Sequence, residues 1–250
     1  MTHHSGSCMR FRGKRVLITG GTSGIGLAGA KRIHEEGGEA IVTGTDELKI
    51  REIKSRWPYI QTVINDAVDS KSAGILAESV PSPLDGIWIN AGYARIGSIK
   101  DTTDEQLGRM IAVNFRSPFS QLSSLYGHLH AGSSVVLTSS SSVYEGNAVT
   151  SAYAATKSAV AAAVRSWATE LASKGVRINT LVPGAIDTGF RSFLPGQARD
   201  DFVKSVVDNT PMGRLGTVDE AASVALFLLS DDSSYMTGTQ VFVDGGLLRR

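Results

Sequence analysis

A tyrosine and a lysine stand four residues apart in the second half of the chain, as Tyr153 and Lys157. Residues at this spacing share one face of a helix, so the pair would bring an ammonium group beside a phenol. An unperturbed tyrosine has a pKa of about 10, and a nearby cation lowers that pKa. Of six tyrosines, only Tyr153 has a lysine four residues later. The pair is a candidate for general acid–base chemistry, although the same spacing alone also fits a surface packing contact.

A glycine-rich segment near the start of the chain, with Gly20, Gly24 and Gly26, follows an apolar run and precedes a helical pattern. Glycines there permit a tight turn and a close approach of the backbone to phosphate, which the N-terminus of a helix attracts. Glycines also occur in ordinary turns, but this position between strand and helix favours nucleotide binding. Because no Lys-Ser/Thr pair follows the glycines, the segment is not a Walker loop.

The elements that would position these residues alternate between short apolar strands and helices. Several strands, such as Val16-Leu17-Ile18, are nearly continuous apolar runs, which is typical of strands covered on both faces. The alternation predicts a parallel sheet with helices on both sides. We expect strands at 15–20, 39–44, 61–66, 86–90, 134–139, 177–182 and 240–244, and helices at 24–36, 46–56, 103–126, 151–173 and 218–230.

No linker, repeat or shift in composition divides the chain, so we predict a single domain over 13–250 after a flexible tail at 1–12. The segment 187–211 departs from the alternation, because it carries Gly189, Pro195, Gly196 and Pro211 among charged and aromatic residues. Long insertions in compact domains are usually functional, and ligands bind beyond the carboxyl ends of parallel strands. We therefore interpret 187–211 as a substrate lid.

Composition excludes several classes of function. The chain has 250 residues, with 25 Lys and Arg against 24 Asp and Glu, so nothing draws it to nucleic acid or to a membrane surface. Its longest apolar run near the end, 224–229, is too short to span a bilayer. A single cysteine, Cys8, forms no internal disulfide and fits a cytoplasmic protein. Without a Cys/His cluster we expect no metal site.

Four further motifs make the pattern specific. Asn90-Ala91-Gly92 follows the fourth expected strand, and Pro183-Gly184-x-Ile186-x-Thr188 follows the sixth. The tail contains Met212-Gly213-Arg214-Leu215-Gly216 and Val243-Asp244-Gly245-Gly246. With the glycine segment, these motifs resemble the short-chain dehydrogenase/reductase family over 13–246, in the branch of bacterial 3-oxoacyl-carrier-protein reductases. The resemblance implies a single-domain α/β Rossmann fold, a doubly wound parallel seven-stranded sheet of order 3-2-1-4-5-6-7, and usually a homotetramer.

The same resemblance implies an NAD(P)-dependent oxidoreductase that moves a hydride between the cofactor and a small or medium ketone or secondary alcohol. It makes Tyr153 the acid/base and gives Lys157 a further contact with the nicotinamide ribose. Among four consecutive serines, Ser140 stands at the distance from Tyr153 that the family's serine keeps from its tyrosine, so the resemblance implies that Ser140 hydrogen-bonds the substrate oxygen. Asn114 matches the residue that kinks its helix and holds a water, which relays protons through Lys157.

The cofactor contacts that the resemblance implies follow the ends of the strands. They are Gly20, Thr22, Ser23, Gly24, Ile25, Gly26, Thr45, Asp46, Asp66, Ala67, Asn90, Ala91, Gly92, Tyr153, Lys157, Pro183, Gly184, Ile186 and Thr188.

The choice between NAD and NADP depends on the end of the second strand, where a carboxylate selects NAD and a cation selects NADP. Gly44 offers no carboxylate and Thr45 no cation. Asp46 would repel a 2′-phosphate, whereas Lys49 and Arg51 would attract one. The choice stays open, with NAD slightly favoured.

Two alternatives remain. A 3-oxoacyl-[acyl-carrier-protein] reductase would present basic residues to an acidic carrier protein; Lys174 fits, but 126–132 lacks the usual Arg/Lys run. A catalytically silent NAD(P)-binding scaffold or sensor is the other, and the intact set of Asn114, Ser140, Tyr153 and Lys157 argues against it.

Overall fold

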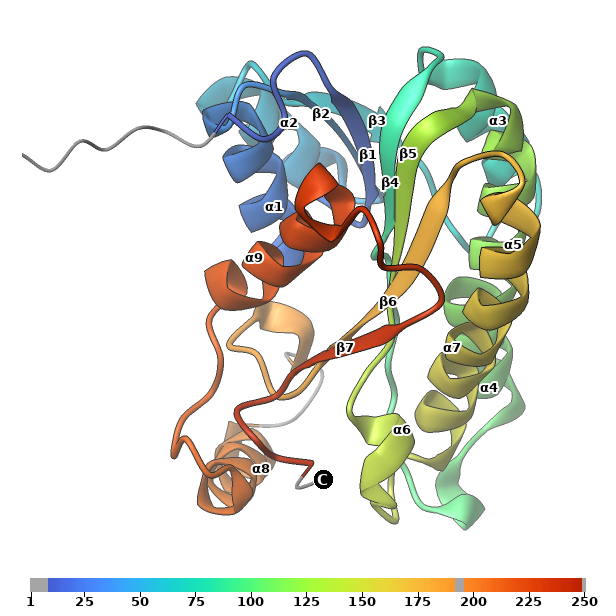
Figure 1. The fold of residues 1–250 in the computed structure, drawn as a ribbon. Helices are drawn as coiled ribbons and strands as arrows, with labels where there is room; N and C mark the ends of the chain where they lie inside the picture. Colours follow the sequence, from blue (N-terminus) through green and yellow to red (C-terminus); the bar gives the residue numbers. More distant parts are fainter. Residues whose placement is uncertain (1–8, 192–195, 249–250) are drawn as a thin grey trace, which may run out of the picture.

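The computed structural model describes residues 9–191 and 196–248. Seven strands form one parallel sheet in the order β3-β2-β1-β4-β5-β6-β7, with helices on both faces (Figure 1). This arrangement is a Rossmann fold, and the predicted strand order is confirmed. The strands are β1 (Arg15–Thr19), β2 (Glu39–Gly44), β3 (Gln61–Ile64), β4 (Leu84–Ile89), β5 (Leu129–Thr138), β6 (Arg177–Pro183) and β7 (Gln240–Val243).

The helices form two layers around the sheet (Figure 1). One face is covered by α1 (Gly24–Glu35), α2 (Glu47–Arg56) and α9 (Val218–Leu229). The other is covered by α3 (Ser72–Ser79), α4 (Asp104–Ile111), α5 (Ser117–Leu125) and α7 (Ser151–Ala172). Two further helices, α6 (Ser142–Glu145) and α8 (Gly196–Asn209), lie at the end of the molecule to which the strands point (Figure 1).

Alternate residues of each central strand enter opposite cores. In β1, Val16 and Ile18 pack in the core beside α1 and α9, whereas Leu17 packs in the core beside α5 and α7. Side chains of a strand point alternately to its two faces, so a strand covered on both sides must be apolar throughout. This requirement is the physical reason for the continuous apolar runs in the sequence.

Some elements differ from the expectation. The helix predicted over 103–126 contains a π-helical turn at Ala112–Arg116 between α4 and α5. Three helices were not predicted: α3, the single turn α6, and α8. The run of serines that leads into α6, and the glycine and proline around α8, are typical of turns, because such residues favour local backbone hydrogen bonds or break helices. β5 begins five residues earlier than expected, at Leu129.

The start of the chain also needs a correction. We predicted a tail over 1–12, but the side chain of Phe11 is fully buried and its backbone N–H donates to Glu36 O at 3.1 Å. The fold therefore includes residues 9–12, while 1–8, with Cys8, lie outside the described residues. Part of the predicted lid, 192–195, also lies outside them.

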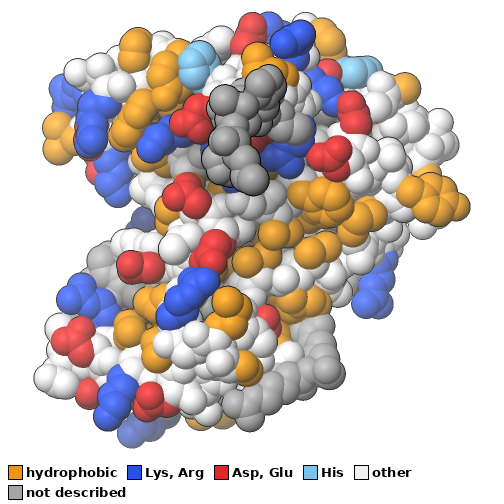
Figure 2. Space-filling view, turned by 60° about the vertical axis from the view of Figure 1, so that its left-hand side comes forward, with side chains coloured by type: hydrophobic (Ala, Val, Ile, Leu, Met, Phe, Trp, Pro, Cys, Tyr) orange, Lys and Arg blue, Asp and Glu red, His pale blue; other side chains and the backbone are white. Residues whose placement is uncertain are grey.

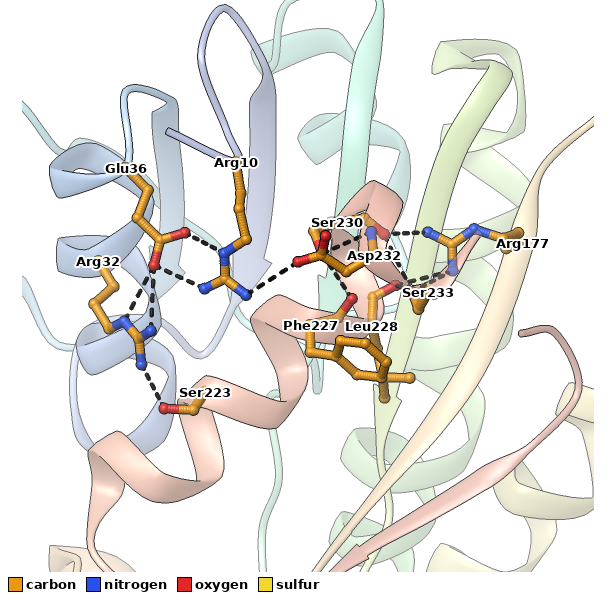
Figure 3. A network of polar contacts seen from close by, with 10 residues as sticks. All are labelled: Arg10, Arg32, Glu36, Arg177, Ser223, Phe227, Leu228, Ser230, Asp232 and Ser233. Carbon is orange, nitrogen blue, oxygen red and sulfur yellow. Dashed lines mark hydrogen bonds and ion pairs between the residues drawn. The ribbon is translucent and has the colours of Figure 1, made fainter. Parts of the chain in front are cut away.

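A polar network fastens the ends of the helices at the opposite end of the sheet from α6 and α8 (Figure 3). Arg10 pairs with Glu36 through two hydrogen bonds of 2.6 and 2.7 Å, and Arg32 joins Glu36 to Ser223 of α9. Arg177 donates to Leu228 O, Ser230 O and Ser233 Oγ. The bidentate pair of Arg10 and Glu36 is strong and geometrically specific. Arg32 holds α9 against α1, and Arg177 holds the end of α9 against the start of β6.

Gly29 of α1 provides a test of this packing. A Cβ on Gly29 would lie 2.4 Å from Cζ3 of the fully buried Trp88, whereas one on Gly108 of α4 would meet nothing within 4 Å. We predict that Gly29→Ala lowers the free energy of unfolding by about 1–3 kcal/mol, because overpacking forces side chains to shift. Gly108→Ala should raise it by about 0.5–1 kcal/mol. Urea unfolding of both variants measures this; equal effects of the two would contradict it.

Candidate functional site

A pocket of about 550 Å³ lies where the strands end. Tyr153, Lys157 and Ser140 line it together with every predicted cofactor contact except Gly26. Asn114 and Gly26 lie behind its wall. The predicted residues, which are spread over 169 positions from Gly20 to Thr188, are thus gathered around one space.

The glycine segment gives the pocket a wall without side chains. Gly20 and Gly24 have φ of +64° and +53°, a conformation that side chains rarely adopt. A Cβ on Gly20 would lie 2.8 Å from the Cα of Ala91, and one on Gly26 would lie 2.9 Å from Gly20 O. The turn therefore closes on the start of α1 as tightly as a phosphate cradle requires, and these residues fit a dinucleotide.

Hydrogen bonds join the ends of three neighbouring strands. The buried Thr19 of β1 accepts the backbone N–H groups of Asn90 and Ala91 at 3.1 and 3.2 Å. The Asn90 amide donates to Gly20 O and accepts from Thr138 Oγ1 of β5. The backbone oxygen of Thr138 in turn accepts from Lys157 Nζ at 2.8 Å. The glycine turn and the lysine are therefore held in one connected network.

Burial controls the titration of the Tyr153 and Lys157 pair. Loss of water around Tyr153, together with the negative charge of Glu145, raises the pKa of the phenol to about 12, although a hydrogen bond from Ser140 opposes the shift. Burial lowers the pKa of the Lys157 ammonium to about 8. We expected the lysine to lower the tyrosine pKa; the structure differs, because desolvation disfavours the charged form of each group.

Ser140 lies two residues after β5, within a run of four serines that have distinct partners. It is half-buried and hydrogen-bonds the phenol of Tyr153. Ser139 Oγ donates to Lys157 O, and Ser141 Oγ donates to Glu145 Oε1. Ser142 donates to Ser140 Oγ. Only Ser140 has its hydroxyl at the phenol, while the neighbouring hydroxyls serve local structure.

Asn114 occupies the π-helical turn. Its side chain is 1% exposed and forms two hydrogen bonds with the backbone of Tyr93, at 2.9 and 2.7 Å, and one with Thr156 Oγ1. A Cβ on Gly92 would lie 3.4 Å from Lys157 Nζ and 3.8 Å from Asn114 Oδ1. Asn114 therefore fixes the loop after β4 beside the lysine, and the irregular turn is of a kind frequent at functional sites.

Gly44, at the end of β2, has no room for the carboxylate side chain that would select NAD. A Cβ there would lie 2.5 Å from Thr22 Cγ2, so any side chain collides with the glycine turn. Asp46 lines the pocket instead, and its Oδ1 accepts the backbone N–H groups of Leu48 and Lys49 as the N-cap of α2. Lys49 also lines the pocket, whereas Arg51 does not.

The sequence did not indicate several residues of the pocket. Glu145 of α6, which accepts a hydrogen bond from Ser141, lines it. Phe190, whose ring centroid lies 6.1 Å from that of Tyr153, and Phe202 and Val206 of α8 provide apolar surface from the predicted lid. Among the described residues no three His, Cys, Asp or Glu side chains gather as metal ligands would. Periodicity signals helices and strands, and it contains no information on which exposed side chains face a cavity.

The surface shows no concentration of charge of one sign on the face that Figure 2 draws. Figure 2 shows basic and acidic side chains interspersed over the face drawn, with no continuous basic area. None of the helices in the described ranges has the length and apolar character needed to cross a membrane.

Comparison with known proteins agrees with this geometry. Residues 20–248 match the family described as enoyl-(acyl carrier protein) reductase. An oxidoreductase of Sarocladium schorii, asL5, is 33% identical over 244 residues, which is 95% of this chain and 97% of the relative. The 3-oxoacyl-[acyl-carrier-protein] reductase of Thermotoga maritima is 32% identical over 251 residues, covering 96% of this chain and 100% of the relative.

Solved structures give the same result. A gluconate 5-dehydrogenase from Burkholderia cenocepacia, in complex with NADP and tartrate, superposes with a TM-score of 0.88 at 26% identity, covering 99% of this chain and 100% of that one. A short-chain dehydrogenase/reductase from Brucella melitensis gives a TM-score of 0.88 at 29% identity, covering 96% and 99%. This chain belongs to the short-chain dehydrogenase/reductase family. It is an oxidoreductase that uses a nicotinamide cofactor.

The lowered pKa of Lys157 predicts how stability varies with pH. An unfolded lysine has a pKa of about 10.4, so between pH 8 and 10 the unfolded chain binds more protons than the native one at this residue, and the free energy of unfolding rises with pH. Lys157→Met should remove a rise on the order of 2 kcal/mol across that window. Urea unfolding at both pH values measures it, with the exposed Lys54→Met as control. The same rise in all three proteins would show that burial does not shift the lysine.

Proposed function

We propose that this enzyme reduces small or medium ketones, or oxidises the corresponding secondary alcohols, with Tyr153 as the acid/base. One observation supports this above the others: the hydroxyls of Ser140 and Tyr153 hydrogen-bond each other in the same pocket as the side-chain-free glycine turn. Two adjacent hydroxyl donors are what a developing alkoxide needs.

The two hydroxyls have different roles. Ser140 donates a hydrogen bond to the carbonyl oxygen and polarises it, while Tyr153 gives its proton to that oxygen as negative charge develops. A pKa of about 12 keeps the phenol protonated near neutral pH, which suits a proton donor in the direction of reduction. Phe190 packs near Tyr153 and limits water at the reacting atoms. The nicotinamide supplies or accepts the hydride when it is bound.

Lys157 and Asn114 hold the reacting groups. Lys157, with a pKa of about 8, exchanges a proton easily near neutrality and is placed to contact the nicotinamide ribose. Asn114 orients the loop of Tyr93 at the back of the lysine, where a water that passes protons to Lys157 would be held. The glycine turn, Asn90 and Asp66 would bind the remainder of the dinucleotide.

We propose a modest preference for NAD over NADP. The N-terminus of α2, which would otherwise attract a 2′-phosphate, is already capped by the carboxylate of Asp46. Thr45 adds no cation. Lys49, which lines the same pocket, partly offsets the repulsion, so the preference should be small.

A 3-oxoacyl-[acyl-carrier-protein] reductase is the second candidate function. Relatives bearing that name in Thermotoga maritima and Chlamydia pneumoniae are 32% and 33% identical to this chain. We propose further that 187–211 covers the substrate, since α8 contributes Phe202 and Val206 to the pocket. A homotetramer in the cytoplasm remains our expectation; exposed aromatic side chains such as Phe115 and Phe119 on one helical face offer surface for association.

Tyr153→Phe tests the acid/base assignment. The variant keeps the ring and loses the proton, so kcat for ketone reduction should fall by roughly 10²–10⁴-fold. Binding of NADH, followed by its fluorescence, should stay near the wild-type value. The assay is oxidation of NADH or NADPH by a panel of ketones. Turnover within a few-fold of wild type would rule out Tyr153 as the proton donor.

Asp46→Asn tests the cofactor preference, because asparagine caps a helix as well as aspartate does and removes only the charge. The ratio of kcat/KM for NADP to that for NAD should rise by roughly three- to tenfold, as expected for one partly screened charge. Lys49→Met should move the same ratio in the opposite direction. A wild-type enzyme with a strong preference for NADP, unchanged in Asp46→Asn, would contradict our interpretation of this loop.

A further inference from the structure

Glu145 brings a negative charge to the reacting end of the pocket. It is the last residue of α6, the single turn that follows Ser140, and its side chain is exposed and lines the pocket. The Ser141 hydroxyl donates to its Oε1 at 2.5 Å, which leaves Oε2 available to a ligand. A carboxylate is an acceptor only, so this position can bind a hydrogen-bond donor or a cation and repels an anion.

The other carboxylates of the pocket lie at its opposite side. Asp46 and Asp66, the remaining described carboxylates that line it, follow β2 and β3. β2 and β5 are separated by β1 and β4, and three strand spacings of about 4.8 Å place Asp46 roughly 14 Å from the end of β5. Those carboxylates belong to the adenosine side, and Glu145 belongs to the nicotinamide side.

No ion pair neutralises Glu145 among the described side chains. Two cations line the pocket besides Lys49. Lys157 is buried and donates to Thr138 O, and the guanidinium of Arg109 lies 4.7 Å from the ring centroid of Tyr93. The charge of Glu145 also reaches the phenol of Tyr153, whose pKa it raises. A substrate held by that phenol is therefore within the field of the carboxylate.

We propose that Glu145 selects substrates by charge: the enzyme takes ketones or alcohols that carry a hydrogen-bond donor, a hydroxyl or an ammonium group, a few bonds from the reacting carbon and discriminates against those that carry a carboxylate there. The inference rests on the proposed function and narrows its substrate class. Phe190, Phe202 and Val206 bound the same space with apolar surface. The matching substrate has a compact apolar body and one polar donor directed at α6.

The test compares cyclohexanones with one substituent opposite the carbonyl: methyl, hydroxyl, amino or carboxylate. In the wild type, kcat/KM should be highest for the amino and hydroxyl compounds and lowest for the carboxylate. Glu145→Gln keeps an acceptor for Ser141 and removes the charge. It should raise the ratio of carboxylate to amino substrate roughly tenfold, as expected for one charge at short range.

Two further variants make the result decisive. Glu52→Gln removes an exposed carboxylate of α2 outside the pocket and should leave the ratio unchanged. Glu145→Ala, which also removes the contact with Ser141, should shift the ratio as Glu145→Gln does. Comparing the hydroxyl with the amino compound separates hydrogen bonding from charge, because only the amino compound should lose its advantage at high salt.

The outcomes separate the two proposals. If the methyl compound is turned over with NAD or NADP, but the ratio is the same in wild type and both Glu145 variants, the selection by Glu145 is wrong and the proposed function stands. If a wide panel of ketones and alcohols gives no turnover with either cofactor, the proposed function itself fails.

Discussion

The side chain of Thr19 accepts the backbone N–H groups of Asn90 and Ala91, and the site depends on this contact. β1 and β4 are the neighbours at which the chain reverses its direction of winding, so their ends leave a crevice that only loops can fill. Thr19 holds those loops together. Asn90 then accepts a hydrogen bond from Thr138, whose backbone oxygen accepts one from Lys157. Loss of the Thr19 hydrogen bonds would therefore separate the glycine turn from the reacting residues.

The contact of Thr19 with the loop after β4 brings the backbone segments so close together that glycine is required around it. The turn at Gly20 packs against Ala91 with no room for a side chain, and Gly44 packs against Thr22 in the same way. Backbone polar groups buried in such contacts need partners, which Thr19 and Asn90 supply. The reacting side chains lose water in the same enclosure, and this loss drives the pKa values of Tyr153 and Lys157 apart, raising the first and lowering the second. Tight packing and altered acidity therefore have one cause.

The sequence predicted the sheet order, the strands and the position of Tyr153 beside Ser140 because each leaves a strong local pattern: continuous apolar runs, glycines at a turn, and fixed spacing within a motif. The resemblance implied a kink at Asn114, but neither its π-helical form over Ala112–Arg116 nor the helical turn that carries Glu145 was predicted. The sequence of the first segment is typical of an ordinary helix and that of the second of a serine-rich turn. Tertiary contacts decide which backbone conformation each segment adopts. The direction of the tyrosine pKa was also missed, since spacing shows that a lysine is near and does not show how much water both groups lose.

The most direct test of the account is the fate of a labelled hydrogen. The enzyme would be incubated with a ketone that it reduces and with NADH or NADPH that carries two deuterium atoms at C4 of the nicotinamide, and the alcohol would be analysed by mass spectrometry and NMR. The account predicts one deuterium per molecule of alcohol, bound to the carbon that carried the oxygen and in a single stereochemical configuration. Alcohol without deuterium, or with deuterium in both configurations, would contradict direct transfer in one fixed geometry beside Ser140 and Tyr153.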